Sequence, residues 1–219
     1  MIQLGNGPVI VKCEILSLYY ARFNRMQYGN YLEAMGRVDQ AIAERRRALE
    51  AEPLSLINSA VLGRNLYEGR QYDQAMEELR KTLDMDPGFV QAHLYLGWVY
   101  EQKRMFAEAI AELRQAVGGS GGNLLYVGAL GHAYAIAGER KMAEECLARL
   151  QALQRYVSPN DMAVIHIGLG DKEQAWKYLQ KAYEDHSYWI LFLRIDPRFD
   201  GIRGDPRYQD LLRRMHLSS

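Results

Sequence analysis

The hydrophobic and polar positions of the chain repeat with a period of 34 residues. One ladder consists of Gly29, Gly63, Gly97 and Gly131, and a second, twelve residues later, consists of Ala41, Ala75, Ala109 and Ala143. Leucine precedes the glycine in the second, third and fourth units. Two ladders that share one period indicate that the chain is built from copies of one structural unit.

Within each unit, apolar residues recur every three or four positions in two segments of about a dozen residues, which predicts two amphipathic helices. The glycine falls on the first helix and the alanine on the second, where only small side chains allow two backbones to approach closely. Pro53 and Pro87 stand where the second helix of a unit has to end. One such helical hairpin cannot bury its apolar face alone, so successive hairpins are predicted to stack into a solenoid.

A fifth, shorter unit and an apolar tail follow the four regular units. The fifth unit places Ala163, His166, Ala175, Leu179 and Ala182 in the repeat positions. Further on, Asp205 followed by Pro206 is typical of a helix start, and it predicts a short helix up to about Met215. We expect this tail to cover the open end of the last unit, because it is too apolar for a free chain end.

These positions resemble the tetratricopeptide repeat, whose pattern falls on Leu96, Gly97, Tyr100, Ala109, Leu113 and Ala116. The resemblance implies an all-α, right-handed α-solenoid of about five helix-turn-helix repeats with a C-terminal helical cap. It divides the chain into an atypical N-terminal segment (1–21), four repeats (22–155), a fifth, shorter repeat (156–187) and a capping segment (188–219). The tail is also similar to the ends of tetratricopeptide arrays in bacterial signalling proteins.

The N-terminal segment contains neither glycine nor proline between residues 9 and 28. Its apolar residues recur at helical intervals and predict that the first helix extends far back along the chain. An extended arm is the alternative, since Val9, Ile10 and Val11 are β-branched. Either structure needs a cover for its apolar stripe, so the segment is expected to fold onto the array or to form a homodimer.

The face of the first helices opposite the glycines is the candidate binding site. At 100° per residue, Trp98 points away from the helix that Gly97 packs against. In the tetratricopeptide family this opposite face lines a concave groove that binds peptides. The resemblance therefore implies a partner-binding groove formed by Gln27, Asn30, Glu33, Arg64, Tyr67, Tyr95, Trp98, Glu101 and His132. We expect Trp98 and Tyr95 to be exposed in this groove and Leu94 to be buried. The groove lacks the lysines and asparagines of the family's carboxylate clamp, which argues against an adaptor for chaperone tails.

Composition narrows the class of partner. The chain has 27 basic and 27 acidic residues and no net charge, which is not the electrostatic footprint of a nucleic-acid or anionic-membrane binder. The apolar run 188–193 is too short to cross a bilayer. Cys13 and Cys146 stand far apart without metal-ligand spacing, so a reducing, cytoplasmic location is expected and no metal site is predicted.

No sequence motif of an enzyme is present. The chain contains no phosphate-binding loop, no HExxH pair and no GxSxG elbow. We therefore expect a non-catalytic interaction module that needs no cofactor and whose partner is a protein or a peptide. The alternative function is an oligomerisation scaffold or the sensory part of a bacterial signalling protein, dimerising through its N-terminal helix.

Overall fold

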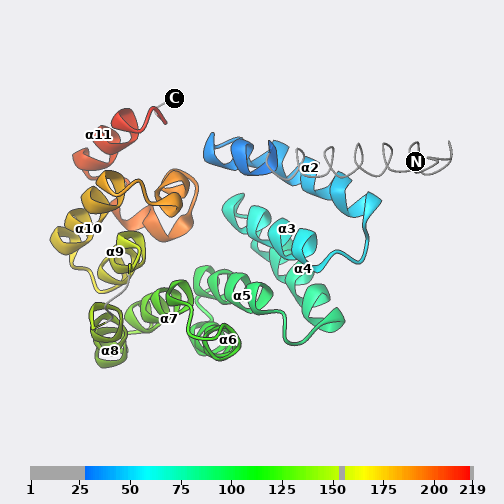
Figure 1. Cartoon of the computed structure of the whole chain (residues 1–219), viewed down its shortest axis with the longest axis horizontal. Helices are drawn as coiled ribbons and strands as arrows, with labels where there is room; N and C mark the ends of the chain where they lie inside the picture. The colour runs from blue at the N-terminus through cyan, green and yellow to red at the C-terminus, as the bar shows by residue number, and fades with distance from the viewer. Residues whose placement is uncertain (1–27, 153–155, 218–219) are drawn as a thin grey trace, which may run out of the picture.

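The computed structural model describes residues 28–152 and 156–217, and all regular secondary structure in these ranges is helical. Residues 28–34 are helical. They are followed by α2 (Val38–Ala51), α3 (Leu56–Glu68), α4 (Tyr72–Met85), α5 (Val90–Gln102), α6 (Phe106–Gly119), α7 (Leu124–Ile136), α8 (Arg140–Gln151), α9 (Pro159–Gly168) and α10 (Lys172–Glu184). Two 3₁₀ helices, η1 (Tyr188–Phe192) and η2 (Pro197–Ile202), lead to α11 (Pro206–Arg214). The prediction of an all-α solenoid is confirmed for the described residues (Figure 1).

Consecutive helices pack as pairs, and the pairs stack into a curved array (Figure 1). The second helix packs on the first helix of its own pair in α3–α4, α5–α6, α7–α8 and α9–α10, and α2, α4, α6 and α8 also pack on the first helix of the next pair. The first helices also pack on one another, α3 on α5 and α7 on α9. The first helices therefore form the inner, concave layer and the second helices the outer one.

The two ladders of small residues mark the helix crossings, as predicted. A Cβ atom added to Gly97 would lie 2.6 Å from Cγ of Leu113 on the paired helix. Ala75 and Ala109 are fully buried. Because any larger side chain would separate the helices of a pair, these positions hold the spacing of the array.

The turn inside each pair follows the same period and contains a left-handed residue. Gly36 and Gly138 have positive φ, and so do Arg70 (φ 60°) and Arg104 (φ 59°) at the equivalent positions. Glycine adopts this helix-ending conformation without a steric penalty, whereas arginine does not. The two arginine turns are therefore strained in the same way, which makes them a matched pair for mutagenesis.

The tail caps the last helix pair, as predicted. Asp205 accepts a hydrogen bond from the Arg207 backbone N–H at 3.0 Å and so caps the N-terminus of α11. Trp176 on α10 donates its indole N–H to Asp205 at 3.0 Å, and Arg207 pairs with Glu173 at 2.9 Å. Leu211 and Leu212 are buried in a cluster with residues of α9 and α10.

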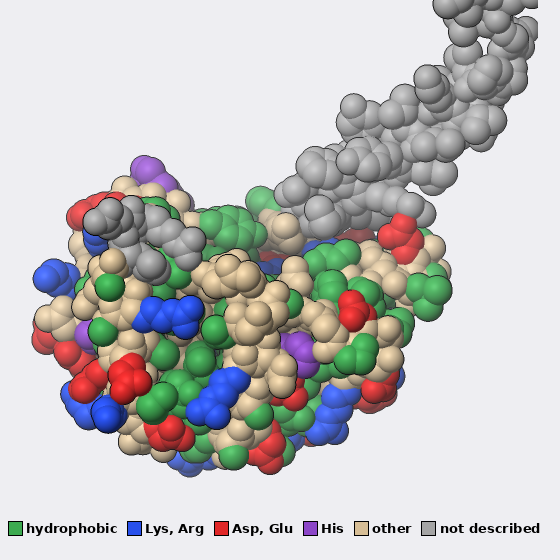
Figure 2. Space-filling model, turned by 60° about the horizontal axis from the view of Figure 1, so that its bottom comes forward, with side chains coloured by type: hydrophobic (Ala, Val, Ile, Leu, Met, Phe, Trp, Pro, Cys, Tyr) green, Lys and Arg blue, Asp and Glu red, His purple; other side chains and the backbone are tan. Residues whose placement is uncertain are grey.

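The surface carries charges of both signs, in agreement with the absence of net charge. Figure 2 shows a face on which acidic and basic side chains are intermixed, without a patch of one sign. In the described ranges, every helix is too short or too polar for a bilayer crossing.

Candidate functional site

The centre of the concave face is filled by the chain itself. The insert, which we define as residues 188–202, lies between the α3 side and the α9 side of the curved array (Figure 1). The Tyr67 hydroxyl of α3 donates a hydrogen bond to Oδ1 of Asp196 at 3.0 Å. The rings of Trp98 and Trp189 meet edge to face with centroids 6.5 Å apart. The insert therefore contacts both α3 and α5, which are far from it in sequence.

The ion pair between Asp196 and Arg198 holds the insert in contact with α5. Arg198 donates from Nη2 to Oδ2 of Asp196 at 2.6 Å, and its backbone N–H donates to Oδ1 at 3.0 Å. The Arg198 guanidinium lies 3.9 Å from the centre of the Trp98 ring, a cation–π contact. Burial alone would raise the pKa of Asp196, but Arg198 outweighs burial and holds it below its ordinary value.

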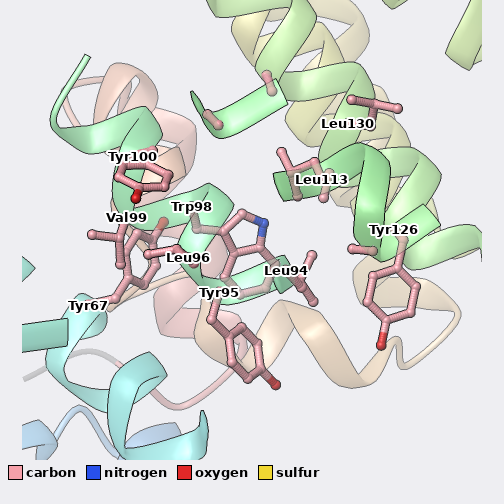
Figure 3. Packing of buried hydrophobic residues seen from close by; sticks show 14 of the residues in the cluster. Tyr67, Leu94, Tyr95, Leu96, Trp98, Val99, Tyr100, Leu113, Tyr126 and Leu130 are labelled. Atoms are coloured by element: carbon pink, nitrogen blue, oxygen red, sulfur yellow. The ribbon is translucent and has the colours of Figure 1, made fainter. Parts of the chain in front are cut away.

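The expected exposure of the groove residues is wrong. Trp98 is only 2 % exposed and Tyr95 is 7 % exposed. Figure 3 shows the Trp98 ring among the side chains of Tyr67, Tyr95 and Leu94, and the ring centroids of Tyr95 and Trp98 are 5.2 Å apart. The predicted direction of Trp98, away from the glycine face, agrees with the structure, but the insert covers that direction. Leu94 is buried, as expected.

The remaining predicted groove residues are brought together on the concave side but are not free. Glu33, Arg64, Tyr67, Glu101 and His132 are buried, and Asn30 is half-buried. Gln27 and the N-terminal segment lie outside the described residues. A partner-binding role for these residues stays a prediction.

Charged residues at the N-terminal end of the concave face neutralise one another. Glu33 accepts hydrogen bonds from Arg64 and, at 2.7 Å, from Asn65. Burial raises the pKa of Glu68 to about 8, with Arg64 opposing this effect and Glu33 adding to it. The Arg64 guanidinium also lies 5.1 Å from the ring centre of Phe192 in the insert. This cluster is thus a structural support for the insert.

Two polar atoms near Trp98 are left without a partner. His132 Nδ1 lies 3.0 Å from Oε2 of Glu101, and both side chains are buried. Oε1 of Glu101 and the indole N–H of Trp98 are buried without a hydrogen-bond partner among the described residues. Such unpaired groups carry a free-energy cost, and they distinguish this place from an ordinary apolar core.

At one edge of the concave face, a pocket of about 630 Å³ remains open. We call it the edge pocket. It is bounded by the N-terminal ends of α7 and α9, the end of α10 and the start of η1. Its lining residues are Asn123, Leu124, Leu125, Tyr156, Ser158, Asp161, Asp185, His186, Ser187, Tyr188 and Trp189.

The edge pocket has a mixed lining, and hydrogen bonds join parts of its frame. The Ser158 and Ser187 hydroxyls lie 3.0 Å apart and join α9 to the start of the insert. Asn123 caps α7 by accepting a hydrogen bond from the Leu125 backbone N–H at 3.1 Å. Sequence reasoning missed this pocket, because its walls come from helix ends and from the insert, which no repeat pattern describes.

Within the described ranges, no group of three or more His, Cys, Asp or Glu side chains is placed to hold a metal ion. The acidic and histidine side chains of the edge pocket therefore do not form a metal centre by themselves.

Comparisons with known proteins show what part of the array is similar to. Residues 61–123 match the family model described as tetratricopeptide repeat. The solved structure of TTC0263, a thermophilic TPR protein in Thermus thermophilus, is similar with a TM-score of 0.63 and 23 % identity. The match covers 81 % of this chain and 98 % of that chain. MamA from Desulfovibrio magneticus RS-1, residues 41 to the end, is similar with a TM-score of 0.52 and 16 % identity, covering 76 % and 96 %. No curated protein matches the sequence.

Proposed function

Because the chain carries tetratricopeptide repeats, we propose that it is a non-catalytic interaction module that binds a segment of a partner protein in the edge pocket. The observation that carries this proposal is the contrast within one concave face. The insert fills the centre of the face, whereas the edge keeps a volume of about 630 Å³. That volume accommodates one or two side chains of a partner segment.

The lining of the edge pocket supports binding of a protein segment. Tyr188 is 52 % exposed and stands beside the half-buried Trp189, with ring centroids 5.6 Å apart. Aromatic side chains in partly covered places are the residues that most often dominate the free energy of protein association. Asn123 and His186 add polar groups at the rim. Hydrogen bonds at helix ends frame the pocket, and a preformed frame reduces the ordering that binding requires.

The test uses one substitution that fills the pocket and one that does not. Leu124→Trp places a large ring at the start of α7, inside the pocket. Leu54→Trp is the control, because Leu54 is 82 % exposed and is not among the residues that line the edge pocket. Partners captured from the source cells by the unaltered chain would be purified, and their affinity for both variants would be measured by calorimetry. We expect Leu124→Trp to weaken binding at least tenfold and Leu54→Trp to leave it unchanged. Equal affinity of both variants would contradict binding in the pocket.

A second proposal keeps the predicted groove residues as the binding site. A partner segment that replaces the insert would reach the indole N–H of Trp98 and Oε1 of Glu101, which have no partner among the described residues. Asp200→Ala tests this idea from outside the groove. It removes the hydrogen bonds that Asp200 accepts from Arg70 at 2.7 and 2.8 Å and from Arg203 at 2.6 Å, and so loosens the insert. Tighter partner binding by this variant would favour replacement of the insert, and unchanged binding would favour the edge pocket.

Dimerisation through the N-terminal helix and a cytoplasmic location stay predictions. The helix concerns residues outside the described ranges, and light scattering at several concentrations is the measurement that tests for a dimer.

A further inference from the structure

The edge pocket contains a carboxylate in an unusual environment. Asp161 lies in the first turn of α9, lines the pocket and is 5 % exposed. A Cβ atom added to Gly128 on α7 would lie 2.7 Å from Cβ of Asp161. Because only glycine leaves room at that point, the packing of α7 against α9 holds the Asp161 side chain in a fixed place.

No described residue neutralises this carboxylate. Among residues 28–152 and 156–217, none forms a hydrogen bond or an ion pair with the Asp161 side chain. The cation that acts on it is Arg198 of η2, whose Nε and Nη2 atoms are already bound to Asp196. Burial raises the pKa of Asp161 to about 7, and Arg198 only partly opposes this effect. An ionised carboxylate that is buried without a partner carries a large free-energy cost.

The other described residues of the lining add negative charge and aromatic rings but no cation. Asp185 stands at the rim, and none of the described lining residues is a lysine or an arginine. Tyr188 and Trp189 present two rings at right angles to one another, and a cation over such a ring is attracted by its negative face. His186 is the remaining titratable group of the lining besides the tyrosines.

These features select the charge of the occupant. An anion would be repelled by Asp161 and Asp185, and an apolar side chain would leave the Asp161 carboxylate buried and unpaired. A cationic side chain would supply both the missing hydrogen-bond donors and the missing charge. We propose that the edge pocket binds the side chain of a lysine or an arginine in the partner segment, with the Asp161 carboxylate as its charge partner. This inference rests on the proposed function and specifies the chemistry of the partner.

The first experiment needs no altered protein. Two blocked pentapeptides would be titrated into the ¹⁵N-labelled chain at low salt and pH 8, one with a central arginine and one with the uncharged analogue citrulline. The flanking residues are glycine and serine in both. We expect the arginine peptide to produce saturable shifts of the backbone amides of residues 123–125 and 187–189, with an affinity at least tenfold higher than that of the citrulline peptide. Equal affinity, or no saturable shift with either peptide, would overturn the proposal.

The second experiment compares two acids of the same pocket. Asp161→Asn keeps the shape of the side chain and removes its charge, and Asp185→Asn does the same at the exposed rim. We expect Asp161→Asn to weaken binding of the arginine peptide about tenfold or more, and Asp185→Asn to weaken it less than about threefold. A spectrum with unchanged dispersion verifies that each variant is folded. Equal effects of the two substitutions would mean that general attraction, and not a built site, holds the peptide.

The two proposals fail in different ways. If Leu124→Trp abolishes partner binding while Asp161→Asn leaves it unchanged, the pocket binds partners but does not select a positively charged side chain. If neither substitution changes partner binding, the edge pocket is not the binding site and the proposed function fails with it.

Discussion

The centre and the edge of the concave face differ in whether their buried carboxylates have a partner among the described residues. At the centre, Asp196 is held by Arg198 and by Tyr67, and Glu33 is held by Arg64. At the edge, no described residue pairs with the Asp161 carboxylate, although it too is buried. Because one chain builds both places from the same helix layer, the difference separates a surface that is already occupied from one that is available.

Position on the concave face does not by itself identify a binding residue. Trp98 has the side-chain type and the direction of a binding residue, yet Arg198 and Trp189 cover it. Asp161 lies in the first turn of a helix, where acidic residues are common, yet its charge is unmatched. A buried carboxylate without a partner among the described residues is therefore the better guide to a binding site in this molecule.

The largest expected effect is a difference in how much a ring at the centre and a ring at the edge contribute to the free energy of unfolding. Trp98→Ala removes a ring at the centre that is 2 % exposed, and we expect it to lower the free energy of unfolding by about 3 to 5 kcal/mol. Tyr188→Ala at the edge removes a ring that is 52 % exposed and should cost about 1 kcal/mol or less. Urea unfolding of both variants measures the difference. A loss of less than about 1 kcal/mol for Trp98→Ala would mean that the centre is not closed.

The second prediction concerns the pH dependence of stability at the edge. The pKa of Asp161 is about 7 in the folded chain, against about 4 in an unfolded chain, so the folded state binds more protons between these values. The contribution of Asp161 to the free energy of unfolding should therefore fall as the pH rises from about 4 to 7, and then level off.

Asp161→Asn should lack this fall. The free energy of unfolding of the variant, relative to that of the unaltered chain, should therefore increase by a few kcal/mol between about pH 4 and pH 8. The described charged or titratable groups near Asp161 are Arg198, Asp185, His186, Tyr156 and Tyr188, and they are present in both proteins and cancel in the difference. Asp185→Asn is the control and should follow the unaltered chain. Parallel stability curves for Asp161→Asn and the unaltered chain would contradict the unpaired charge.

A smaller effect tests the hydrogen bond between α3 and the insert. Tyr67→Phe removes the hydroxyl that donates to Asp196 and leaves a buried carboxylate with one partner fewer. We expect a loss of about 1 to 3 kcal/mol. Tyr126→Phe is the matched control, because no hydrogen bond joins the hydroxyl of this buried tyrosine to a described residue. Thermal unfolding would contradict the account if both variants lost the same stability.

The smallest expected effect uses the two strained turns. Arg104→Gly removes the backbone strain of an arginine with positive φ and should raise the free energy of unfolding by about 1 kcal/mol. Arg70→Gly relieves the same strain but also removes the surface pair with Asp200, so its gain should be smaller by about 0.2 to 1 kcal/mol. Equal gains from the two substitutions would show that the pair with Asp200 does not contribute to holding the insert.

The fold could be predicted from the sequence because the repeat is a local signal. The period of Gly63, Gly97 and Gly131 reflects helix crossings inside each pair, and these crossings involve residues that lie close together in the chain. Asp205 and Pro206 predicted the start of α11 for the same reason, since a cap depends on its immediate neighbours.

The site could be predicted only in part. The direction of Trp98 follows from helical geometry, but its cover comes from Trp189 and Arg198, which lie far away in sequence. No periodicity links Asp196 to Tyr67, so the path of the insert across the concave face could not be predicted from the sequence. The unmatched charge of Asp161 depends on what surrounds it in space, which a first-turn aspartate does not reveal.

The most direct test of the account asks whether the insert covers Trp98 in solution. The measurement is a nuclear Overhauser spectrum of the full chain, with assignment of the indole protons of Trp98 and Trp189, together with the rate of solvent exchange of the Trp98 indole N–H. The two rings have centroids 6.5 Å apart and the indole N–H is buried, so we expect cross-peaks between the two rings and slow exchange. Absence of these cross-peaks, together with rapid exchange of the Trp98 indole N–H, would contradict a closed centre.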